Sequence, residues 1–328
     1  MPRDMEAEPD VAPDRPVTIV YLAYGPPRLV LNGVFSALTF ERAARDLERE
    51  WRFAIYTDQP HLFRRYGIDR DLIPLSALRD ENAVTAYLHR SKMAAVNHAA
   101  TVYEGDLFYL DADTYLMSSP ARHLNALSPQ SSIMHKAEYV VDETTRPHLY
   151  QAIKSPERRA EAIRLAAGAP EIVMWNAGTL GIAEANKHLI PEVLDVADEL
   201  YGVYRYHLAE QLAWALVFSR VGSVIAADDL IYHYWFGQEE ITHRVARFLR
   251  GNTSTPHDQL SERAYALRPR ATPDWSPPLA VRARVTARAL RARYRQMRTG
   301  ARGTSHAKAP EPQDELTLAI KRLGGEGS

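Results

Sequence analysis

The segment 107–113, with the sequence LFYLDAD, constrains the fold of this chain more than any other. Four apolar or aromatic residues lead directly into two carboxylates two positions apart. Such a run is typical of a buried parallel strand, and in open α/β sheets ligands bind beyond the carboxyl ends of these strands. Carboxylates are costly to bury unless they are paired or hold a cation. The segment therefore predicts a strand that ends at a binding site containing Asp111 and Asp113.

Strand-like and helix-like segments alternate ahead of this strand. Residues 17–23 and 51–58 are rich in β-branched and aromatic side chains, whereas 32–49 and 83–101 have apolar residues at helical spacing. The order strand, helix, strand, helix, strand is that of parallel sheets with right-handed crossovers. We therefore expect an α/β fold whose acidic pair follows the third clear strand.

The alternation continues after the acidic pair. Segments with the pattern of further strands or helices are 131–135, 171–175, 179–182, 221–225 and 230–235 for strands and 155–167, 183–201 and 208–220 for helices. In this arrangement Asn176-Ala177-Gly178 opens a loop at a strand end. A second acidic pair, Asp69-Arg70-Asp71, follows no apolar run, and we expect it in a solvated turn or at a helix start.

Composition narrows the chemistry. The 328 residues are 46% hydrophobic, which is enough for a sizeable core, and the absence of cysteine excludes disulfides, thiolate metal sites and a cysteine nucleophile. A formal net charge of −1 gives no general attraction to nucleic acid, so we expect no such partner. The acidic beginning of the chain lacks the features of a signal peptide, and no run approaches the roughly 20 apolar residues of a membrane span. A cytoplasmic location is expected.

The two ends of the chain differ from its middle. Residues 1–16 are polar and acidic and are expected to form a disordered leader before a globular domain at 17–250. Residues 251–278 are rich in proline, serine, threonine and asparagine, which predicts a linker or a wrapping segment. Residues 303–328 are expected to be a flexible tail.

Residues 279–302 hold eight arginines and no acidic residue, with apolar residues every three or four positions. This is the pattern of a basic amphipathic helix. Such a helix suits peripheral contact with an anionic membrane surface, such as the inner face of the cell membrane, or with an acidic partner or nucleic acid. The alternative is a solvated helix packed on the core.

Polar residues downstream of the acidic pair are candidates for the same site. In Asn176-Ala177-Gly178, glycine allows close backbone approach, and asparagine offers a donor and an acceptor to a polyhydroxyl ligand. Glu210 and Gln211 begin an apolar helix, so they either face a pocket or lie in an exposed first turn. His233, on an expected strand, is either a ligand or a structural histidine.

A strand-helix-strand half is followed in order by the acidic pair, Asn176-Ala177-Gly178, Glu210-Gln211 and His233. This order of motifs resembles the GT-A glycosyltransferases, most of all the glycogenin-like and lipopolysaccharide galactosyl- or glucosyltransferases of family 8. The resemblance covers about residues 17–240. It implies a single GT-A-like domain with a mixed, mostly parallel central sheet flanked by helices, to which the basic helix is added. The implied reaction moves a sugar from a nucleotide-diphosphate donor, with a UDP-sugar favoured, to a hydroxyl of a glycan, lipid or small molecule in bacterial glycan or glycoconjugate synthesis.

The resemblance also implies a cofactor, Mn²⁺ or Mg²⁺, bound by Asp111 and Asp113 with His233 as the third ligand. The residues implied to bind the donor are Ala23, Tyr24, Gly25, Lys92, Asp111, Asp113, Ala177 and Gly178. Those implied in catalysis are Asn176, Glu210 and Gln211. Lys92, on the expected helix 83–101, either contacts the diphosphate or is solvated beside Arg90.

The sequence departs from the family pattern at two points. Glu210 stands where the family usually has an aspartate, and His233-Tyr234-Trp235-Phe236-Gly237 keeps only part of the late histidine motif. The stereochemical outcome therefore stays open. An inverting enzyme would need a carboxylate base, for which the candidates are Glu210, Asp228 and Asp229. A retaining enzyme would need none and would have Gln211 near the anomeric carbon.

Two other functions fit some of the same residues. A strand followed by Asp111-Ala112-Asp113-Thr114 also resembles the start of haloacid-dehalogenase-like phosphatases, with Asp111 as nucleophile, Asp113 as general acid and Asp228-Asp229 as a later acidic motif. That family opens with this strand, whereas here a strand-helix-strand half precedes it. The other alternative is a non-catalytic adaptor with the same fold.

Overall fold

The structure is a computed structural model that describes residues 15–78, 88–155, 160–168, 171–203 and 208–272. The chain divides into two units, 1–275 and 276–328, and all of the described residues belong to the first. The predicted basic helix 279–302, the predicted tail 303–328 and nearly all of the predicted leader lie outside the described residues.

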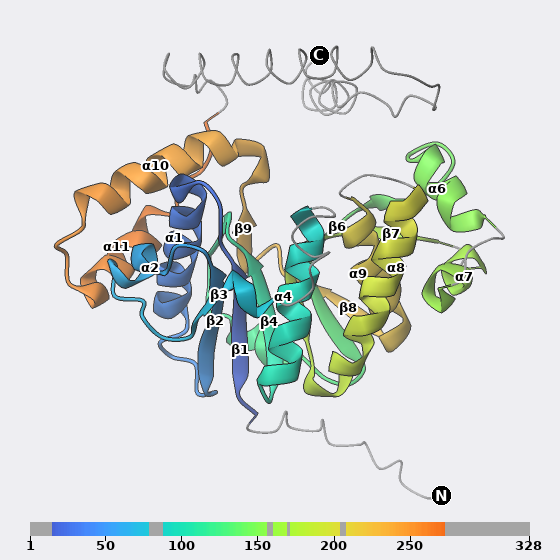
Figure 1. The fold of residues 1–328 in the computed structure, drawn as a ribbon, viewed down its shortest axis with the longest axis horizontal. Coiled ribbons are helices and arrows are strands. Elements are labelled where there is room, and N and C mark those ends of the chain that lie inside the picture. The colour runs from blue at the N-terminus through green and yellow to red at the C-terminus, as the bar shows by residue number, and fades with distance from the viewer. Residues whose placement is uncertain (1–14, 79–87, 156–159, 169–170, 204–207, 273–328) are drawn as a thin grey trace, which may run out of the picture. The chain divides into compact units, whose positions relative to one another are not determined.

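A seven-stranded sheet forms the centre of the first unit, in the order β3-β2-β1-β4-β7-β6-β8 (Figure 1). Its strands are β1 (Val17–Leu22), β2 (Trp51–Thr57), β3 (Leu72–Pro74), β4 (Asp106–Asp111), β6 (Ser131–Val140), β7 (Val173–Ile182) and β8 (Ser223–Ala226). The β1–β2, β1–β4, β2–β3 and β6–β8 pairs are parallel, whereas β7 runs antiparallel to β4 and β6. The predicted mixed, mostly parallel sheet is therefore confirmed.

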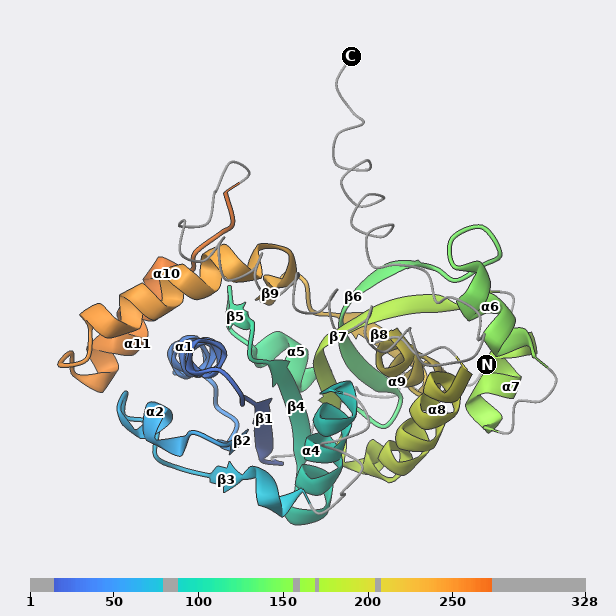
Figure 2. The ribbon, with the colours of Figure 1, turned by 45° about the horizontal axis from the view of Figure 1, so that its top comes forward.

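Helices cover both faces of this sheet (Figures 1 and 2). One face is covered by α4 (Leu88–Val102), α8 (Ile190–Val203) and α9 (Leu208–Val221). The other carries α1 (Pro27–Ala43), on which α10 (Gln238–Gly251) and α11 (His257–Leu267) pack. α1 begins earlier than expected because proline is well suited to the first turn of a helix.

The side chains of β4 alternate between these two helical layers. Leu107 and Tyr109 belong to the core under α4, α8 and α9, and Phe108 and Leu110 to the core under α1, α10 and α11. Successive residues of a strand point to opposite faces, so a strand covered on both faces is apolar at every position. This explains why the run 107–110 has no polar residue before Asp111.

The sheet differs from the prediction at β7. Residues 171–175 and 179–182 were expected to be two strands separated by a loop, but the structure has one continuous strand, Val173–Ile182, that includes Asn176-Ala177-Gly178. The prediction of a strand end at these residues was therefore wrong. A glycine inside a strand marks the close approach of another group, and the imidazole of His233 approaches Gly178 here.

A two-stranded antiparallel ribbon, β5 (Thr114–Leu116) and β9 (Ile231–His233), lies outside the main sheet (Figure 2). Its register sets Thr114 opposite His233. Because β5 leaves the turn that follows Asp111, the ribbon brings a histidine from late in the chain to the acidic pair. The sequence did not predict β5, which has only three residues and a partner far along the chain.

The remaining described α-helices are short: α2 (Pro60–Arg64), α5 (Ala121–Asn125), α6 (Pro147–Lys154) and α7 (Glu161–Gly168). The predicted linker or wrapping segment 251–278 contains α11, which packs against α1. Asp69-Arg70-Asp71 lies in an exposed turn before β3, as expected. In the part of the chain that the structure describes, we find no helix with the length and apolar character of a membrane span.

Candidate metal and donor site

The site lies at the edge of the sheet where two adjacent parallel strands end. Leu22, the last residue of β1, is paired with Asp111, the last residue of β4. The segment Ala23-Tyr24-Gly25, predicted to bind the donor, therefore leaves the sheet beside the acidic pair. Gly25 has a left-handed backbone, with φ of +88°, and its N–H faces the carboxylate of Asp58 at 3.2 and 3.3 Å.

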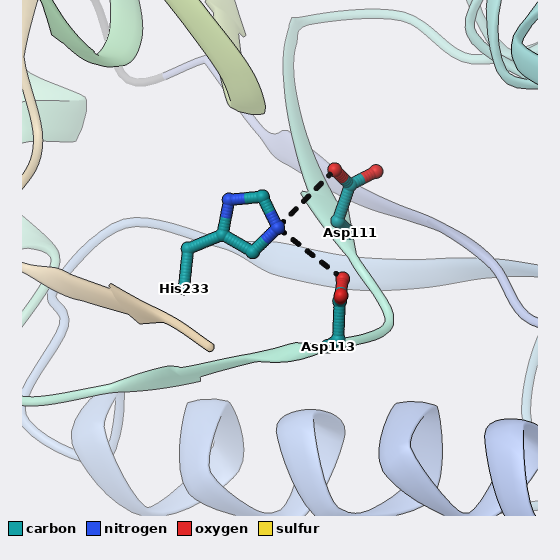
Figure 3. Close-up of side chains that lie close together, drawn as sticks. All are labelled: Asp111, Asp113 and His233. Atoms are coloured by element: carbon teal, nitrogen blue, oxygen red, sulfur yellow. Dashed lines mark ion pairs between the residues drawn. The ribbon is translucent and has the colours of Figure 1, made fainter. Parts of the chain in front are cut away.

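Asp111, Asp113 and His233 come together at this edge (Figure 3). Nε2 of His233 lies 3.4 Å from Oδ1 of Asp113 and 3.8 Å from Oδ2 of Asp111. One potential ligand atom from each of the three residues falls within 4.8 Å of the other two. The structure thus brings together the three residues that the sequence suggested as metal ligands.

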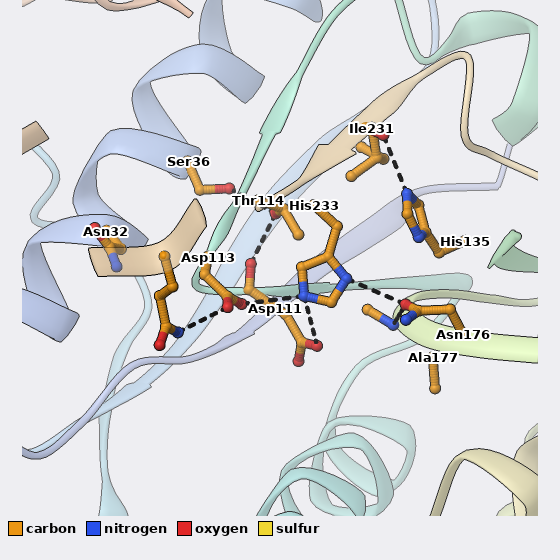
Figure 4. A network of polar contacts seen from close by, with 12 residues as sticks. Asn32, Ser36, Asp111, Asp113, Thr114, His135, Asn176, Ala177, Ile231 and His233 are labelled. Carbon is orange, nitrogen blue, oxygen red and sulfur yellow. Dashed lines mark hydrogen bonds and ion pairs between the residues drawn. The ribbon is translucent and has the colours of Figure 1, made fainter. Parts of the chain in front are cut away.

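Asn176 fixes the orientation of the His233 imidazole through the ring nitrogen Nδ1, which faces away from the carboxylates. Nδ1 lies 3.1 Å from Oδ1 of Asn176, which also accepts the N–H of Gly178 at 2.9 Å (Figure 4). Nδ2 of Asn176 donates to Glu138 at 3.0 Å, so the orientation of the amide is fixed by its partners. Oδ1 can only accept, and Nδ1 of His233 must therefore carry a proton. Nε2 is then the nitrogen that faces the carboxylates.

The electrostatics of the group favour a positive charge between the acids. Burial alone would lower the pKa of His233, but the hydrogen bond and charge of Asp113, helped by Asp111, raise it above its ordinary value. Burial would raise the pKa of Asp113, yet His233 and a hydrogen bond from Gln238 lower it. A proton on the imidazole or a cation in its place is stabilised by the same carboxylates.

Lys92, on α4, is buried behind Asp111. Its Nζ lies 3.3 Å from Oδ1 of Asp111 and 3.3 Å from Oε1 of Glu210, and it donates to the carbonyl of Ala177. Burial would lower the pKa of Lys92, but the two carboxylates outweigh it and raise the pKa. The alternative of a solvated lysine beside Arg90 is therefore wrong: the ammonium joins the acidic pair to α9.

Glu210 lies in the first turn of α9 and is only 1% exposed, so the alternative of an exposed first turn is wrong for this residue. Burial raises its pKa to about 7, with Lys92 acting against the rise. Gln211 is half-buried, and among the described residues it has no hydrogen bond to Asp111, Asp113 or His233. Of the Glu210-Gln211 pair, only the glutamate is linked to the acids, through Lys92.

Several partners of the acids were not foreseen from the sequence. The Tyr109 hydroxyl donates to Oδ1 of Asp111 at 2.8 Å, and Nε2 of Gln238 donates to Oδ2 of Asp113 at 2.8 Å. The Thr114 hydroxyl donates to the carbonyl of Asp111 at 2.7 Å. Tyr109 and Thr114 adjoin the acidic pair in sequence and could have been suspected, whereas no pattern singles out Gln238.

The acids Asp228 and Asp229 lie apart from this group. Both are exposed, and Asp229 forms an ion pair with Arg122 and lies 3.0 Å from Nε2 of His123. Among the described residues, the only group with metal-ligating geometry is Asp111, Asp113 and His233. A later acidic motif joined to Asp111, as the phosphatase alternative requires, is not formed.

The side chains of this group suit a divalent cation. Two carboxylate oxygens and an imidazole nitrogen are hard or borderline ligands, of the kind that Mg²⁺ and Mn²⁺ accept. A metal-bound histidine usually donates its other N–H to an oxygen acceptor, which is the role that Asn176 has here. Asp111, Asp113 and His233 could therefore hold such an ion, with Asn176 and Lys92 positioning its ligands.

The sequence matches no family model and no curated protein. Among solved structures, the chain is similar to the galactosyltransferase LgtC in complex with donor and acceptor sugar analogues, at 14% identity and a TM-score of 0.41 over 64% of this chain and 72% of that one. It is also similar to apo mouse xyloside xylosyltransferase 1, at 12% identity and a TM-score of 0.44 over 65% and 86%. An active-site mutant of LgtC matches at 15% identity and a TM-score of 0.39 over 64% and 72%. These neighbours are glycosyltransferases, as the resemblance seen in the sequence predicts.

Proposed function

We propose that this protein is a metal-dependent glycosyltransferase that moves a sugar from a nucleotide-diphosphate donor to an acceptor hydroxyl. The proposal rests on one observation: the ligand atoms of Asp111, Asp113 and His233 gather within 4.8 Å where adjacent parallel strands end. Ligands bind at such strand ends in open α/β sheets, and a divalent cation there suits a diphosphate better than a neutral substrate.

The chain's own residues would have distinct roles in this reaction. Asp111, Asp113 and His233 would hold Mn²⁺ or Mg²⁺, which when bound neutralises the charge that develops on the departing diphosphate. Asn176 acts as a positioning residue, because its Oδ1 fixes which nitrogen of His233 faces the acids. Lys92 would hold Asp111 in place and add positive charge to the group.

The donor would extend from the acids toward the end of β1, with the base and ribose at Ala23-Tyr24-Gly25 and the sugar near Ala177 and Gly178. We favour a UDP-sugar as the donor and a glycan, lipid or small molecule as the acceptor. A role in bacterial glycoconjugate synthesis and a cytoplasmic location, with the basic segment 279–302 in contact with the inner membrane surface, remain predictions.

We do not assign Asp228 or Asp229 as the base that deprotonates the acceptor hydroxyl, because both are exposed and Asp229 is paired with Arg122. Glu210, with a pKa raised by burial to about 7, has the proton affinity of a base at neutral pH. Its carboxylate, however, is buried behind Lys92. We therefore assign Glu210 a positioning role through Lys92, which is compatible with a retaining reaction that needs no carboxylate base.

The test is donor hydrolysis with a panel of UDP- and GDP-sugars, with Mn²⁺ or with EDTA. We expect release of nucleoside diphosphate that needs the metal and falls at least 100-fold in Asp113→Asn, as expected for loss of a ligand to the ion. Asp69→Asn, in the exposed second acidic pair, is the matched control and should keep full activity. Metal-independent turnover, or full turnover by Asp113→Asn, would refute the proposal.

The same assay separates the alternatives. Cleavage of a generic aryl phosphate without hydrolysis of any nucleotide sugar would identify a phosphatase. Binding of a nucleotide sugar without turnover, seen as a rise in melting temperature, would identify an adaptor, because a ligand that binds only the folded state stabilises it.

A further inference from the structure

A cavity of about 400 Å³ lies between the end of β5 and the C-terminal end of α11 with the chain that follows it. Its lining residues are Tyr115, Met117, Ala266, Leu267, Arg268 and Arg270. None of these belongs to the candidate metal site, and the volume is in the range of small-molecule pockets. The cavity therefore needs an explanation separate from the proposed function.

Arg268 is held rigidly at this cavity. Its Nη1 donates to the carbonyl of Met117 at 2.8 Å, and its guanidinium carbon lies 4.3 Å from the centre of the Tyr265 ring. Its backbone has φ of +26°, a strained conformation for a residue with a side chain, and its carbonyl accepts from the Tyr115 hydroxyl at 3.2 Å. The surrounding contacts fix this side chain before any ligand arrives.

Arg270 provides a second guanidinium. It lies over the Tyr232 ring at 5.1 Å, and Nη2 is 3.6 Å from Sδ of Met117. Neither Arg268 nor Arg270 forms an ion pair with any described carboxylate, whereas their neighbour Arg244 is paired with Glu240 at 3.2 Å. Each guanidinium has five N–H groups, so most donors of Arg268 and Arg270 are not used by these contacts.

Beside the two guanidinium groups, the cavity lining includes the apolar side chains of Met117, Ala266 and Leu267. Tyr115 is fully buried beneath the cavity, where its ring stacks on Tyr232 with ring centres 5.0 Å apart, whereas Leu267 is 38% exposed. An anionic ligand with a small apolar part would match the two guanidinium groups and this aliphatic surface. Guanidinium groups bind phosphate through paired hydrogen bonds, and two of them match the charge of a dianion.

We propose that this cavity is a binding site for a small organic phosphate, with Arg268 and Arg270 holding the phosphate and Met117 and Leu267 contacting the organic part. The site does not depend on the proposed glycosyltransferase activity. It requires neither a cation nor any residue of the Asp111, Asp113 and His233 group.

The test is isothermal titration calorimetry of the full chain with phenylphosphonate, an anion that no phosphatase can hydrolyse, in the presence of EDTA. We expect binding by the wild type, roughly tenfold weaker binding by Arg270→Gln, and further loss in Arg268→Gln/Arg270→Gln, since each charged hydrogen-bond donor contributes about this factor. Arg263→Gln, on α11 but away from the cavity lining, is the matched control and should bind as the wild type does.

Equal binding by the wild type and Arg270→Gln would overturn the proposal, as would the absence of binding by the wild type at millimolar concentrations. The exposed Arg270 keeps the test valid if Arg268→Gln does not fold. Benzamide, which lacks the anionic group, should bind no more weakly to Arg270→Gln than to the wild type. Donor hydrolysis is measured in a separate assay. Absence of phosphonate binding would therefore not contradict the proposed glycosyltransferase function, and absence of donor hydrolysis would not contradict the phosphate site.

Discussion

Gly178 of β7 lies directly against the imidazole of His233 on β9: a β-carbon added at position 178 would stand 2.3 Å from Nδ1 and 2.5 Å from Cε1 of the ring. The two residues fit together only because Gly178 has no side chain. Since its N–H also donates to Oδ1 of Asn176, the same strand supplies both the space for the ring and the acceptor that orients it.

Gly178→Ala should therefore displace the imidazole and weaken Mn²⁺ binding by about 10- to 100-fold, the usual effect of disturbing the groups that orient a metal ligand. Calorimetric titration with Mn²⁺ measures this directly. The control is Gly202→Ala on α8, where an added β-carbon would meet no atom within 4 Å. Unchanged Mn²⁺ affinity in Gly178→Ala would contradict the role of His233 as a ligand.

Lys92→Met should lower the free energy of unfolding by about 3–5 kcal/mol, because it leaves the buried carboxylate of Glu210 without its partner. The double variant Lys92→Met/Glu210→Leu removes both charges and should recover part of that loss. Urea unfolding of the wild type and both variants provides the comparison. A double variant less stable than Lys92→Met would show that Glu210 has another source of stabilisation.

Arg49→Met should destabilise the fold by about 3–5 kcal/mol, since it leaves Asp106 buried without its cation. Arg49 also donates to the carbonyls of Arg15 at 2.6 Å and Leu124 at 2.9 Å. The control is Arg122→Met, whose ion pair with Asp229 is largely exposed and should contribute no more than about 1 kcal/mol. Thermal or urea unfolding measures both variants. Equal losses of unfolding free energy in Arg49→Met and Arg122→Met would contradict the prediction that the buried ion pair contributes more than the exposed one.

His257 should make stability depend on pH. A hydrogen bond to Glu41, with Nε2 at 2.9 Å from the carboxylate, raises the pKa of His257 from 6.5 to about 9. The folded state holds this proton more tightly than the unfolded chain, so the contribution is complete below about pH 6.5 and is lost as the pH rises to about 9. The free energy of unfolding should fall over that interval.

His257→Gln should remove this fall, and Glu41→Gln should reduce it, when urea unfolding is compared at intervals between about pH 6 and 10. His188→Gln, which removes an exposed histidine elsewhere, serves as the control. The assignment is contradicted if the wild type and His257→Gln show the same dependence on pH.

Local sequence patterns were sufficient for much of the sheet and for the acids. β1, β2 and β4 were predicted because apolar strands covered on both faces leave continuous apolar runs. Asp111 and Asp113 could be singled out because they directly follow such a run. His233 could be suggested only from the order of motifs, since its place near the acids depends on the ribbon.

The rest of the site depends on contacts that no local pattern records. Asn176 and Gly178 resemble a turn in sequence, because glycine and asparagine are common there, but here they fit a strand to a ring from β9. Gln238 meets Asp113 across the fold without any sequence signal. α11 was obscured by its polar, proline-containing surroundings, although Leu260 and Ala264 have the i, i+4 spacing of its buried face.

The ribbon of β5 and β9 joins segments that the ribosome makes at widely separated times. A nascent chain that has emerged only as far as β8 contains both aspartates but not yet the imidazole that joins them. Pairing β5 with β9 closes a long loop, which lowers the conformational entropy of the chain before the stabilising contacts form. Such long-range pairings therefore form slowly. The protein therefore completes its three-residue group only after most of the domain has been synthesised, and an unfinished chain cannot present it to the metal ions of the cell.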